Sequence, residues 1–350
     1  MTVASEARGR LNAIQYLRAA AALMVVAFHV LGPAWTVGSA GVDVFFVISG
    51  FVIALVTNSP TVTPLGFAYD RAARILPLYW LCTLVLALAV AIAPALFPRL
   101  PFSSEWLVMS LAMLPAFKPG TSDVFPMLYQ GWTLNYEAFF YVVALIAVFL
   151  PLRQRFLAIS AILVAFLAAG HWFPSSKAWA RVYTDPLLIE FLAGYAFGHL
   201  RLHGLRLGRL AGHALVAFGL FGFGLAAMSG EGPDGWHRIL VWGVPAFCLV
   251  AGGVVVEDRG ALPTIPLAGL IGEASYAIYL THGLAISLLV VVWRRLGLMT
   301  PDGLDAPALA VATFGLCVAG GIVFHRLVEQ PLQRRLKRRK RVRIDPAPAR

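Results

Sequence analysis

The sequence predicts an all-α membrane protein, a polytopic bundle of about ten transmembrane helices with one additional short interfacial or re-entrant segment. Of its 350 residues, 59% are hydrophobic and 13% are charged, whereas a soluble domain has about 45–50% apolar and about 25% charged residues. The apolar residues occur in repeated blocks whose lengths approach the roughly 17–25 residues that a helix needs to cross a bilayer. The segments between these blocks are short, which leaves little room for a separate soluble domain.

Ten blocks are candidate spans, and one further apolar stretch is too short to be counted with them. That stretch, residues 105–117, is flanked by prolines, which favours an interfacial or re-entrant segment. The ten candidate spans are residues 14–31, 42–57, 75–97, 132–150, 156–172, 186–200, 211–228, 239–256, 272–293 and 306–324.

The distribution of basic residues predicts the orientation. The net charge is +11, and ten of the 28 basic residues lie between Arg326 and Arg350. With ten spans, 20 basic residues fall on the side of both termini and seven on the other side, so the positive-inside rule places both termini in the cytoplasm. We therefore divide the chain into a membrane domain, residues 1–330, and a basic cytoplasmic tail, residues 331–350. A basic tail after the last span favours contact with membrane lipids over nucleic-acid binding.

Cysteine and histidine spacing does not predict a metal site. Cys82, Cys248 and Cys317 each lie inside an apolar run, which favours core packing over a disulfide framework. His199 and His203 have the i, i+4 spacing of zinc ligands, but no acidic residue or cysteine lies near them in the sequence. We therefore expect no metal.

The first span places two ionisable side chains where they cost free energy. Arg18 and His29 are eleven residues apart, so they lie on one helical face, about 16 Å apart along the axis. One interpretation is an arginine that extends toward the membrane surface and an interfacial histidine. The other is a functional pair that binds one extended ligand, because intramembrane ionisable residues are rare and usually functional.

The second span begins with an acidic residue at a depth similar to that of His29. Asp43 could orient the imidazole and stabilise its charged form. The alternative is an exposed interfacial carboxylate or a helix cap.

Two arginines precede the third span, in a loop that reads YDRAARILP. Arg71 and Arg74 share a helical face at i, i+3. They could be ordinary positive-inside charges, or they could clamp phosphate groups, for which arginine is well suited.

Polar and aromatic residues also mark the fourth and ninth spans. The fourth span begins GWTLNYEAFFY and places Glu137 inside the membrane, and the ninth span contains His282 near its middle. Intramembrane glutamate and histidine point to function, and a structural hydrogen-bond network between helices is the competing interpretation. The neighbouring candidates for substrate contact or for that network are Trp132, Tyr136, Tyr276 and Tyr279.

Six segments, in this order, make the chain similar to the acyltransferase-3 family of integral membrane acyltransferases, in particular to bacterial exopolysaccharide acetyltransferases. Residues from about 153 to 266 contribute little beyond hydropathy. The six segments are Arg18 through His29, GVDVFFVISGF at 41–51, RAARILP at 71–77, GWTLNYEAFFY at 131–141, SYAIYLTH at 275–282 and FHRLVEQPL at 324–332.

The resemblance implies a ten-span catalytic bundle that takes acetyl-CoA, or another acyl-CoA, from the cytoplasm. The implied acceptor is a sugar hydroxyl of an exported or cell-surface glycan, or of a lipid-linked saccharide. Arg18, Arg71 and Arg74 match the family's cytoplasmic arginines, which are thought to hold coenzyme A. His29 matches its catalytic histidine.

These inferences combine into a direct-transfer hypothesis. His29 acts as general base on the acceptor hydroxyl, and Asp43 or Glu137 orients the imidazole and offsets its new charge. An acyl-histidine intermediate is a variant of this scheme. A transporter or flippase of a lipid-linked glycan is the alternative from another class of protein, and it would have no need for a phosphate site or for thioester consumption. A further alternative keeps the chemistry but changes the acceptor to a lipid, an antibiotic or a peptidoglycan sugar.

Overall fold

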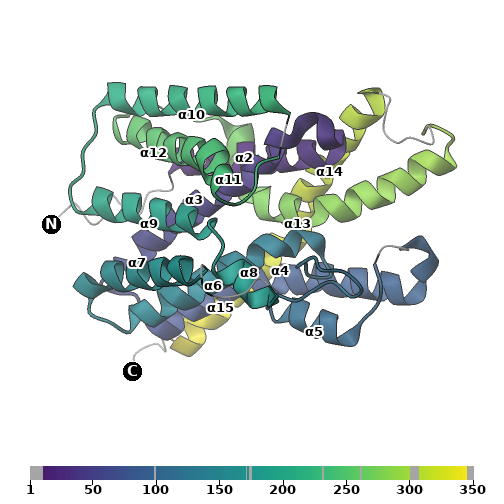
Figure 1. Cartoon of the computed structure of the whole chain (residues 1–350), viewed down its shortest axis with the longest axis horizontal. Coiled ribbons are helices and arrows are strands. Elements are labelled where there is room, and N and C mark those ends of the chain that lie inside the picture. The colour runs from purple at the N-terminus through teal and green to yellow at the C-terminus, as the bar shows by residue number, and fades with distance from the viewer. Residues whose placement is uncertain are drawn as a thin grey trace.

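The computed structural model describes residues 11–97, 100–170, 172, 176–230, 232–260, 262–299 and 307–344, and in these residues it contains helices and no strand (Figure 1). The longer helices are α2 (Asn12–Leu31), α3 (Gly41–Thr57), α4 (Pro64–Ile92), α6 (Trp132–Val148), α7 (Leu152–Ala169), α9 (Leu188–Leu202), α10 (Arg209–Ser229), α12 (Val244–Asp258), α13 (Pro266–Arg295), α14 (Pro307–Phe324) and α15 (Gln330–Ile344). The short helical elements are η1 (Gly32–Ala40), η2 (Pro94–Leu96), α5 (Ser104–Leu111), η3 (Tyr129–Gly131), α8 (Ala178–Tyr183), α11 (Gly235–Arg238) and the π-helical turns η4 (Ile239–Gly243) and η5 (His325–Glu329).

The described part of the chain has nine helices that are long and apolar enough to cross a membrane. The remaining predicted span, residues 186–200, corresponds to α9, whose 15 residues cover only about 22 Å at 1.5 Å per residue. Residues 105–117 contain the eight-residue helix α5, which at about 12 Å is too short to cross a bilayer. The fold is thus the polytopic helical bundle that the hydropathy predicts.

Large apolar side chains are exposed along the outer faces of the bundle. Leu84, Leu88 and Ile92 on α4 are 49%, 61% and 74% exposed, and Leu220 and Phe221 on α10 are 60% and 64% exposed. In water such rows would cost free energy at about 25 cal/mol per Å² of apolar surface. These faces are suited to contact with lipid.

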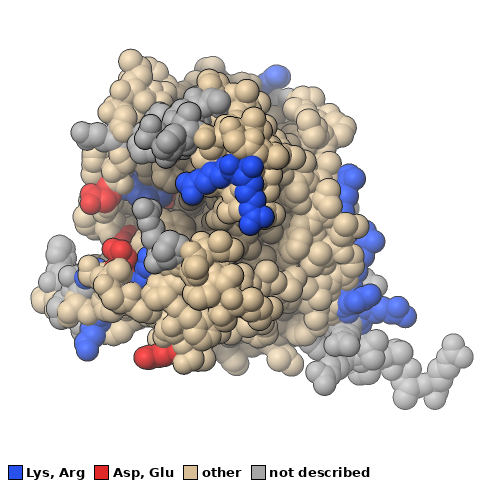
Figure 2. Space-filling model, turned by 90° about the vertical axis from the view of Figure 1, so that its right-hand side faces the viewer, with Lys and Arg blue, Asp and Glu red and all other residues tan. Residues whose placement is uncertain are grey.

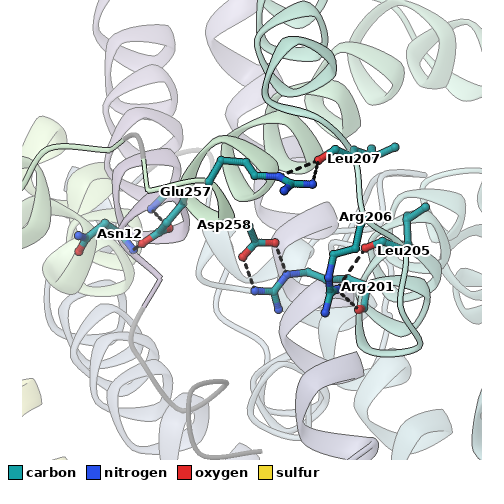
Figure 3. Close-up of polar contacts among 9 residues, drawn as sticks. Asn12, Arg201, Leu205, Arg206, Leu207, Glu257 and Asp258 are labelled. Atoms are coloured by element: carbon teal, nitrogen blue, oxygen red, sulfur yellow. Dashed lines mark hydrogen bonds and ion pairs between the residues drawn. The ribbon is translucent and has the colours of Figure 1, made fainter. Parts of the chain in front are cut away.

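A carboxylate from α12 caps the first helix. The side chain of Glu257 accepts hydrogen bonds of 2.8 Å from the backbone N–H groups of both Asn12 and Ala13, at the start of α2 (Figure 3). The first N–H groups of a helix have no partner inside it, and a negative charge there is favourable. This contact joins the start of α2 to the end of α12.

At the same end of the bundle, side-chain contacts join α12 to α9 and to the segment that follows α9. Arg201 donates two hydrogen bonds to the carboxylate of Asp258, at 2.8 and 2.6 Å, and Arg259 donates to the backbone carbonyl of Leu207 (Figure 3). In Figure 1, α10 packs beside α12. Helices α9, α10 and α12 are therefore held together at the end where α2 begins.

Helices α3 and α9 cross so closely that only glycine fits at the contact. A Cβ atom built on Gly50 would stand 2.1 Å from the carbonyl oxygen of Phe191, and one built on Gly194 would stand 2.0 Å from that of Val47. Small residues let membrane helices approach closely. This crossing buries α9 against the helix that carries Asp43.

The segment YDRAARILP is helical, which corrects its assignment to a loop. Helix α4 begins at Pro64, with the side chain of Thr63 accepting a hydrogen bond of 3.1 Å from the N–H of Gly66. A threonine cap followed by proline at the first helical position is a typical helix start. Arg71 and Arg74 therefore extend from a rigid helix of 29 residues.

The basic tail continues the last spanning helix. The π-helical turn η5 follows α14, and α15 continues directly from it to Ile344. The described part of the predicted tail is therefore an ordered helix.

Candidate active site

Three cavities follow one another along α2. The basic cavity, of about 940 Å³, contains Arg18, Arg71 and Arg74 in its wall. The middle cavity, of about 100 Å³, shares these three arginines and is otherwise mostly apolar. The histidine cavity, of about 130 Å³, is lined by His29 and shares Tyr279 and Val42 with the middle cavity. The shared residues place the three cavities in one row, from the first half of α2 to its last turn.

The three arginines border both the basic and the middle cavity, and each comes from a helix. Arg18 donates to Ser275 Oγ of α13, at 3.2 Å from Nε and 2.9 Å from Nη2. The guanidinium of Arg71 stands 5.8 Å from the centre of the Tyr141 ring, and its Nε is buried with no acceptor among the described residues. A buried donor without a partner is costly, so this nitrogen is a natural contact for an anionic ligand.

Glu137 lies in the middle cavity rather than in the histidine cavity. Its Oε1 accepts hydrogen bonds from Ser49 Oγ, at 3.1 Å, and from the Tyr141 hydroxyl, at 2.5 Å. Tyr276 lines the same cavity and donates to the carbonyl of Ile75, at 2.7 Å. The first set of hydrogen bonds links α3 to α6, and the second links α13 to α4, on the wall of the middle cavity.

Two histidines meet where the row of cavities ends. The ring centres of His29 and His282 are 4.7 Å apart. His29 lines the histidine cavity, whereas His282 is fully buried and its Nε2 has no hydrogen-bond partner among the described residues. The sequence placed these residues 253 positions apart, and the packing of α13 against α2 brings them together.

The hydrogen bond of His29 fixes its tautomer. Its Nδ1 lies 2.9 Å from the carbonyl oxygen of Val25. Because a carbonyl oxygen only accepts, the neutral ring carries its proton on Nδ1, and the lone pair is on Nε2. Nε2 is therefore the atom that can take a proton from a ligand.

Asp43 does not orient this imidazole. Both of its carboxylate oxygens accept from Arg238, at 3.0 Å from Nε and 2.7 Å from Nη2, and the carboxylate is fully buried. A guanidinium matches a carboxylate with two parallel hydrogen bonds, which a neutral imidazole cannot offer. The expected contact of Asp43 or Glu137 with His29 is thus replaced by the backbone carbonyl of Val25.

Arg238 is the functional candidate that sequence reasoning missed. It lines the histidine cavity together with His29, and its guanidinium lies 4.9 Å from the ring centre of Trp242 and 6.0 Å from that of Trp132. In the sequence, Arg238 is only one of the seven basic residues on the side opposite both termini. Its one signal in the sequence is its position directly before an apolar block.

A second acidic residue, Glu190, lies near the ion pair of Asp43 and Arg238. Glu190 on α9 is 2% exposed, and neither carboxyl oxygen has a partner among the described residues. A Cβ atom built on Gly243, in the turn η4, would stand 2.7 Å from its Oε1. The signal for Glu190 was present in the sequence, since it is an acidic residue inside a predicted span.

The aromatic candidates divide between the two ends of the row. Trp132 lines the histidine cavity, while Tyr136 packs against Phe46 and Trp132 and lines neither the histidine nor the middle cavity. Tyr279 lies between the middle and histidine cavities, with its hydroxyl 2.9 Å from Thr133 Oγ1. Tyr279 therefore forms part of the boundary that a ligand in both cavities would contact.

The end of the molecule where α4 and α13 finish is mostly uncharged (Figures 1 and 2). Figure 2 shows a recess near the middle of this face, beside basic side chains.

Among the described residues, no group of three or more His, Cys, Asp or Glu side chains could hold a metal ion.

Comparison with known proteins identifies one family and two relatives. The sequence model of a family described as "Acyltransferase domain" matches residues 11–326. The "Exopolysaccharide production protein ExoZ" of Rhizobium meliloti (strain 1021) is 38% identical over 309 residues, which cover 88% of this chain and 94% of that protein. The "Acyltransferase MdmB" of Streptomyces mycarofaciens is 28% identical over 379 residues, with 97% and 96% covered. No solved structure matches significantly.

Proposed function

This chain belongs to the acyltransferase-3 family of integral membrane acyltransferases, and from that premise we propose that it is an acyl-CoA-dependent O-acyltransferase of the bacterial inner membrane. The acyl group, acetyl in the first instance, passes from cytoplasmic acyl-CoA to a hydroxyl group of an exported or cell-surface glycan. Both termini lie in the cytoplasm, in agreement with the distribution of basic residues.

The observation that carries this proposal is the row of three cavities, basic at one end and lined by His29 at the other. Acyl-CoA has the same polarity, since its phosphates lie at one end and its thioester at the other, joined by a narrow pantetheine arm. Arg71 and Arg74 hold the phosphates at the mouth of the middle cavity, and Arg18 guides the arm past α13. Arginine suits this task because its guanidinium binds phosphate with two hydrogen bonds.

The chemistry then needs one base. Nε2 of His29 takes the proton of the acceptor hydroxyl while the hydroxyl oxygen attacks the thioester carbonyl carbon. The carbon–sulfur bond breaks, and the thiolate of coenzyme A takes the proton back from the imidazolium. Thiolates are good leaving groups, so positioning of the two substrates supplies much of the acceleration.

Arg238 gives Asp43 a different role from the one expected. The guanidinium borders the histidine cavity, where it offsets the negative charge that develops on the carbonyl oxygen during the attack. Asp43 holds Arg238 in place through two hydrogen bonds. Glu137 contributes from the middle cavity, where it fixes Ser49 and Tyr141 along the path of the donor.

The name of one relative supports a glycan acceptor, since that protein is described by its part in exopolysaccharide production. The other relative is named only as an acyltransferase, so lipid, antibiotic and peptidoglycan-sugar acceptors are the alternatives to test. The transporter reading is not supported by either relative or by the family.

The decisive experiment measures transfer by the purified full chain. The protein in detergent is incubated with acetyl-CoA, radiolabelled in the acetyl group, and a polysaccharide fraction from the host. We expect the polysaccharide to gain label that mild base removes, together with release of free coenzyme A thiol. Release of thiol that does not depend on any added acceptor, or no release at all, would contradict the proposal.

A further inference from the structure

The C-terminal helix α15 forms a wall of the basic cavity. Basic side chains in this wall outnumber acidic ones by six to three. Three of the six are the arginines already described, and the others come from α15. The six are Arg18, Arg71, Arg74, Arg334, Lys337 and Arg338.

The residues of α15 that line the cavity form one helical face. Gln330, Gln333, Arg334, Lys337 and Arg338 have the spacing i, i+3, i+4, i+7 and i+8, which places them in one stripe along the helix. Arg335, on the same helix, does not line the cavity. The orientation of α15 is therefore specific, and it turns three cations toward the cavity.

One contact with α4 and two local contacts in the turn before α15 hold this orientation. The hydroxyl of Tyr69, on α4, donates to the carbonyl oxygen of Leu336 at 2.8 Å. In the turn η5, Glu329 accepts from Gln333 at 2.9 Å and pairs with His325 at 2.6 Å. Helix α15 thus packs on α4, the helix that carries Arg71 and Arg74.

The three cations of α15 have no counter-ion in the described structure. No described carboxylate lies within 4.0 Å of the charged nitrogens of Arg334, Lys337 or Arg338. Arg334 donates only to the side-chain oxygen of Gln330, at 3.2 Å. A cluster of cations facing a cavity attracts an anionic ligand.

We propose that Arg334, Lys337 and Arg338 form a second phosphate subsite, which binds the 3′-phosphate of the coenzyme A donor. The inference rests on the proposed function. If Arg71 and Arg74 hold the diphosphate at the narrow middle cavity, the nucleotide remains in the wide basic cavity, and its 3′-phosphate faces α15. The family match ends at residue 326, so this chain supplies the subsite from beyond the matched region.

Binding of two ligands tests the subsite. Coenzyme A and dephospho-coenzyme A differ only in the 3′-phosphate, and their affinities for the full chain in detergent are measured by titration calorimetry. The variant with Arg334→Gln, Lys337→Gln and Arg338→Gln is compared with the control Arg335→Gln. We expect the triple variant to lose about 10- to 100-fold in affinity for coenzyme A, because charged hydrogen bonds to phosphate are strong. The affinity of the triple variant for dephospho-coenzyme A should stay within about twofold of the wild-type value. The control Arg335→Gln should stay within about twofold of the wild type for both ligands.

The outcomes separate the subsite from the function on which it rests. Equal losses for both ligands, or no loss for either, would overturn the subsite; retained binding of dephospho-coenzyme A also shows that the triple variant is folded. If the variant instead loses only its binding to vesicles of anionic lipid, α15 binds lipid headgroups and the subsite is wrong. If the wild-type chain binds neither ligand, the proposed donor fails, and the subsite fails with it.

Discussion

At the scale of single residues, His29 combines a free Nε2, a position in a cavity and a neighbouring histidine ring. Replacing His29 with Ala should lower turnover by about 10²- to 10⁴-fold, the usual contribution of a general base. Binding of coenzyme A should not change, since Arg18, Arg71 and Arg74 remain. Radiolabel transfer and calorimetric binding measure the two quantities.

His282 serves as the comparison, because it packs on His29 but lines no cavity of the row. We expect His282→Ala to cause the smaller loss of turnover. If His282→Ala is inactive while His29→Ala retains substantial turnover, the base has been misassigned. Loss of coenzyme A binding in His29→Ala would indicate a structural role.

The second residue-scale prediction concerns the arginines of α4. Replacing Arg71 or Arg74 with Gln should weaken coenzyme A binding by about tenfold or more while the protein still inserts in the membrane. Lysine should restore binding only in part, because it lacks the two-pronged geometry of arginine. Unchanged calorimetric affinity in both Gln variants would make these residues determinants of orientation alone.

The third concerns the buried pair of Asp43 and Arg238. Replacing Asp43 with Ala leaves a buried guanidinium without its partner, which should cost about 3–5 kcal/mol of stability. The control is Asp258→Ala: this carboxylate pairs with Arg201 at a partly exposed site, where an ion pair contributes about 0–1 kcal/mol. Thermal unfolding in detergent compares them, and equal shifts of the melting temperature would contradict the assignment.

At the scale of helices, the crossing of α3 and α9 determines the position of Asp43 and Ser49. Replacing Gly50 with Ala should separate the two helices, since the new Cβ would stand 2.1 Å from a backbone oxygen, and overpacking costs about 1–3 kcal/mol. Gly224→Ala is the control, because nothing lies within 4 Å of its Cβ position. A lower melting temperature is expected for Gly50→Ala only, and equal melting temperatures for the two variants would show that the crossing tolerates a methyl group.

The elements differ in how well the sequence predicts them. Long spans such as α10 follow from hydropathy, because a bilayer requires about 20 apolar residues. Hydropathy predicts a loop at the start of α4 because this stretch is too polar, although Thr63 and Pro64 carry the signal of a helix start. Hydropathy does not distinguish the π-helical turns from α-helix, yet one follows Arg238 directly and the other holds His325 in the wall of the basic cavity. Such turns are frequent at functional sites.

The candidate site is predictable only in part, because the sequence shows which residues share one helix but not which helices pack together. The common face of Arg18 and His29 follows from helix geometry alone, and both line cavities of one row. The pairing of Asp43 with Arg238 spans 195 positions, and no local pattern reports a contact between two distant helices. The similar depth of Asp43 and His29 in the membrane suggests His29 as the partner of Asp43. A buried carboxylate, however, pairs preferentially with a permanent cation.

At the scale of the whole molecule, the orientation in the membrane stays a prediction. A reporter fused after Arg341 should be active only if it works in the cytoplasm, because α15 carries many of the basic residues that the positive-inside rule places there. The measurement compares a cytoplasmic reporter with a periplasmic one at the same position. Activity of the periplasmic reporter would invert the proposed map and move the basic cavity to the other side of the membrane.

The cap on the first helix has a consequence for biogenesis. The carboxylate of Glu257 that binds the N–H groups of Asn12 and Ala13 lies about 245 positions further along the chain. During synthesis, α2 leaves the ribosome long before α12 exists, so nothing in the early chain supplies this contact. Arg18 and His29 are carried by α2, so the cap on the helix that holds them can form only after α12 has been made. A nascent chain that stops short of Glu257 would contain both residues but would leave the first N–H groups of their helix without this acceptor.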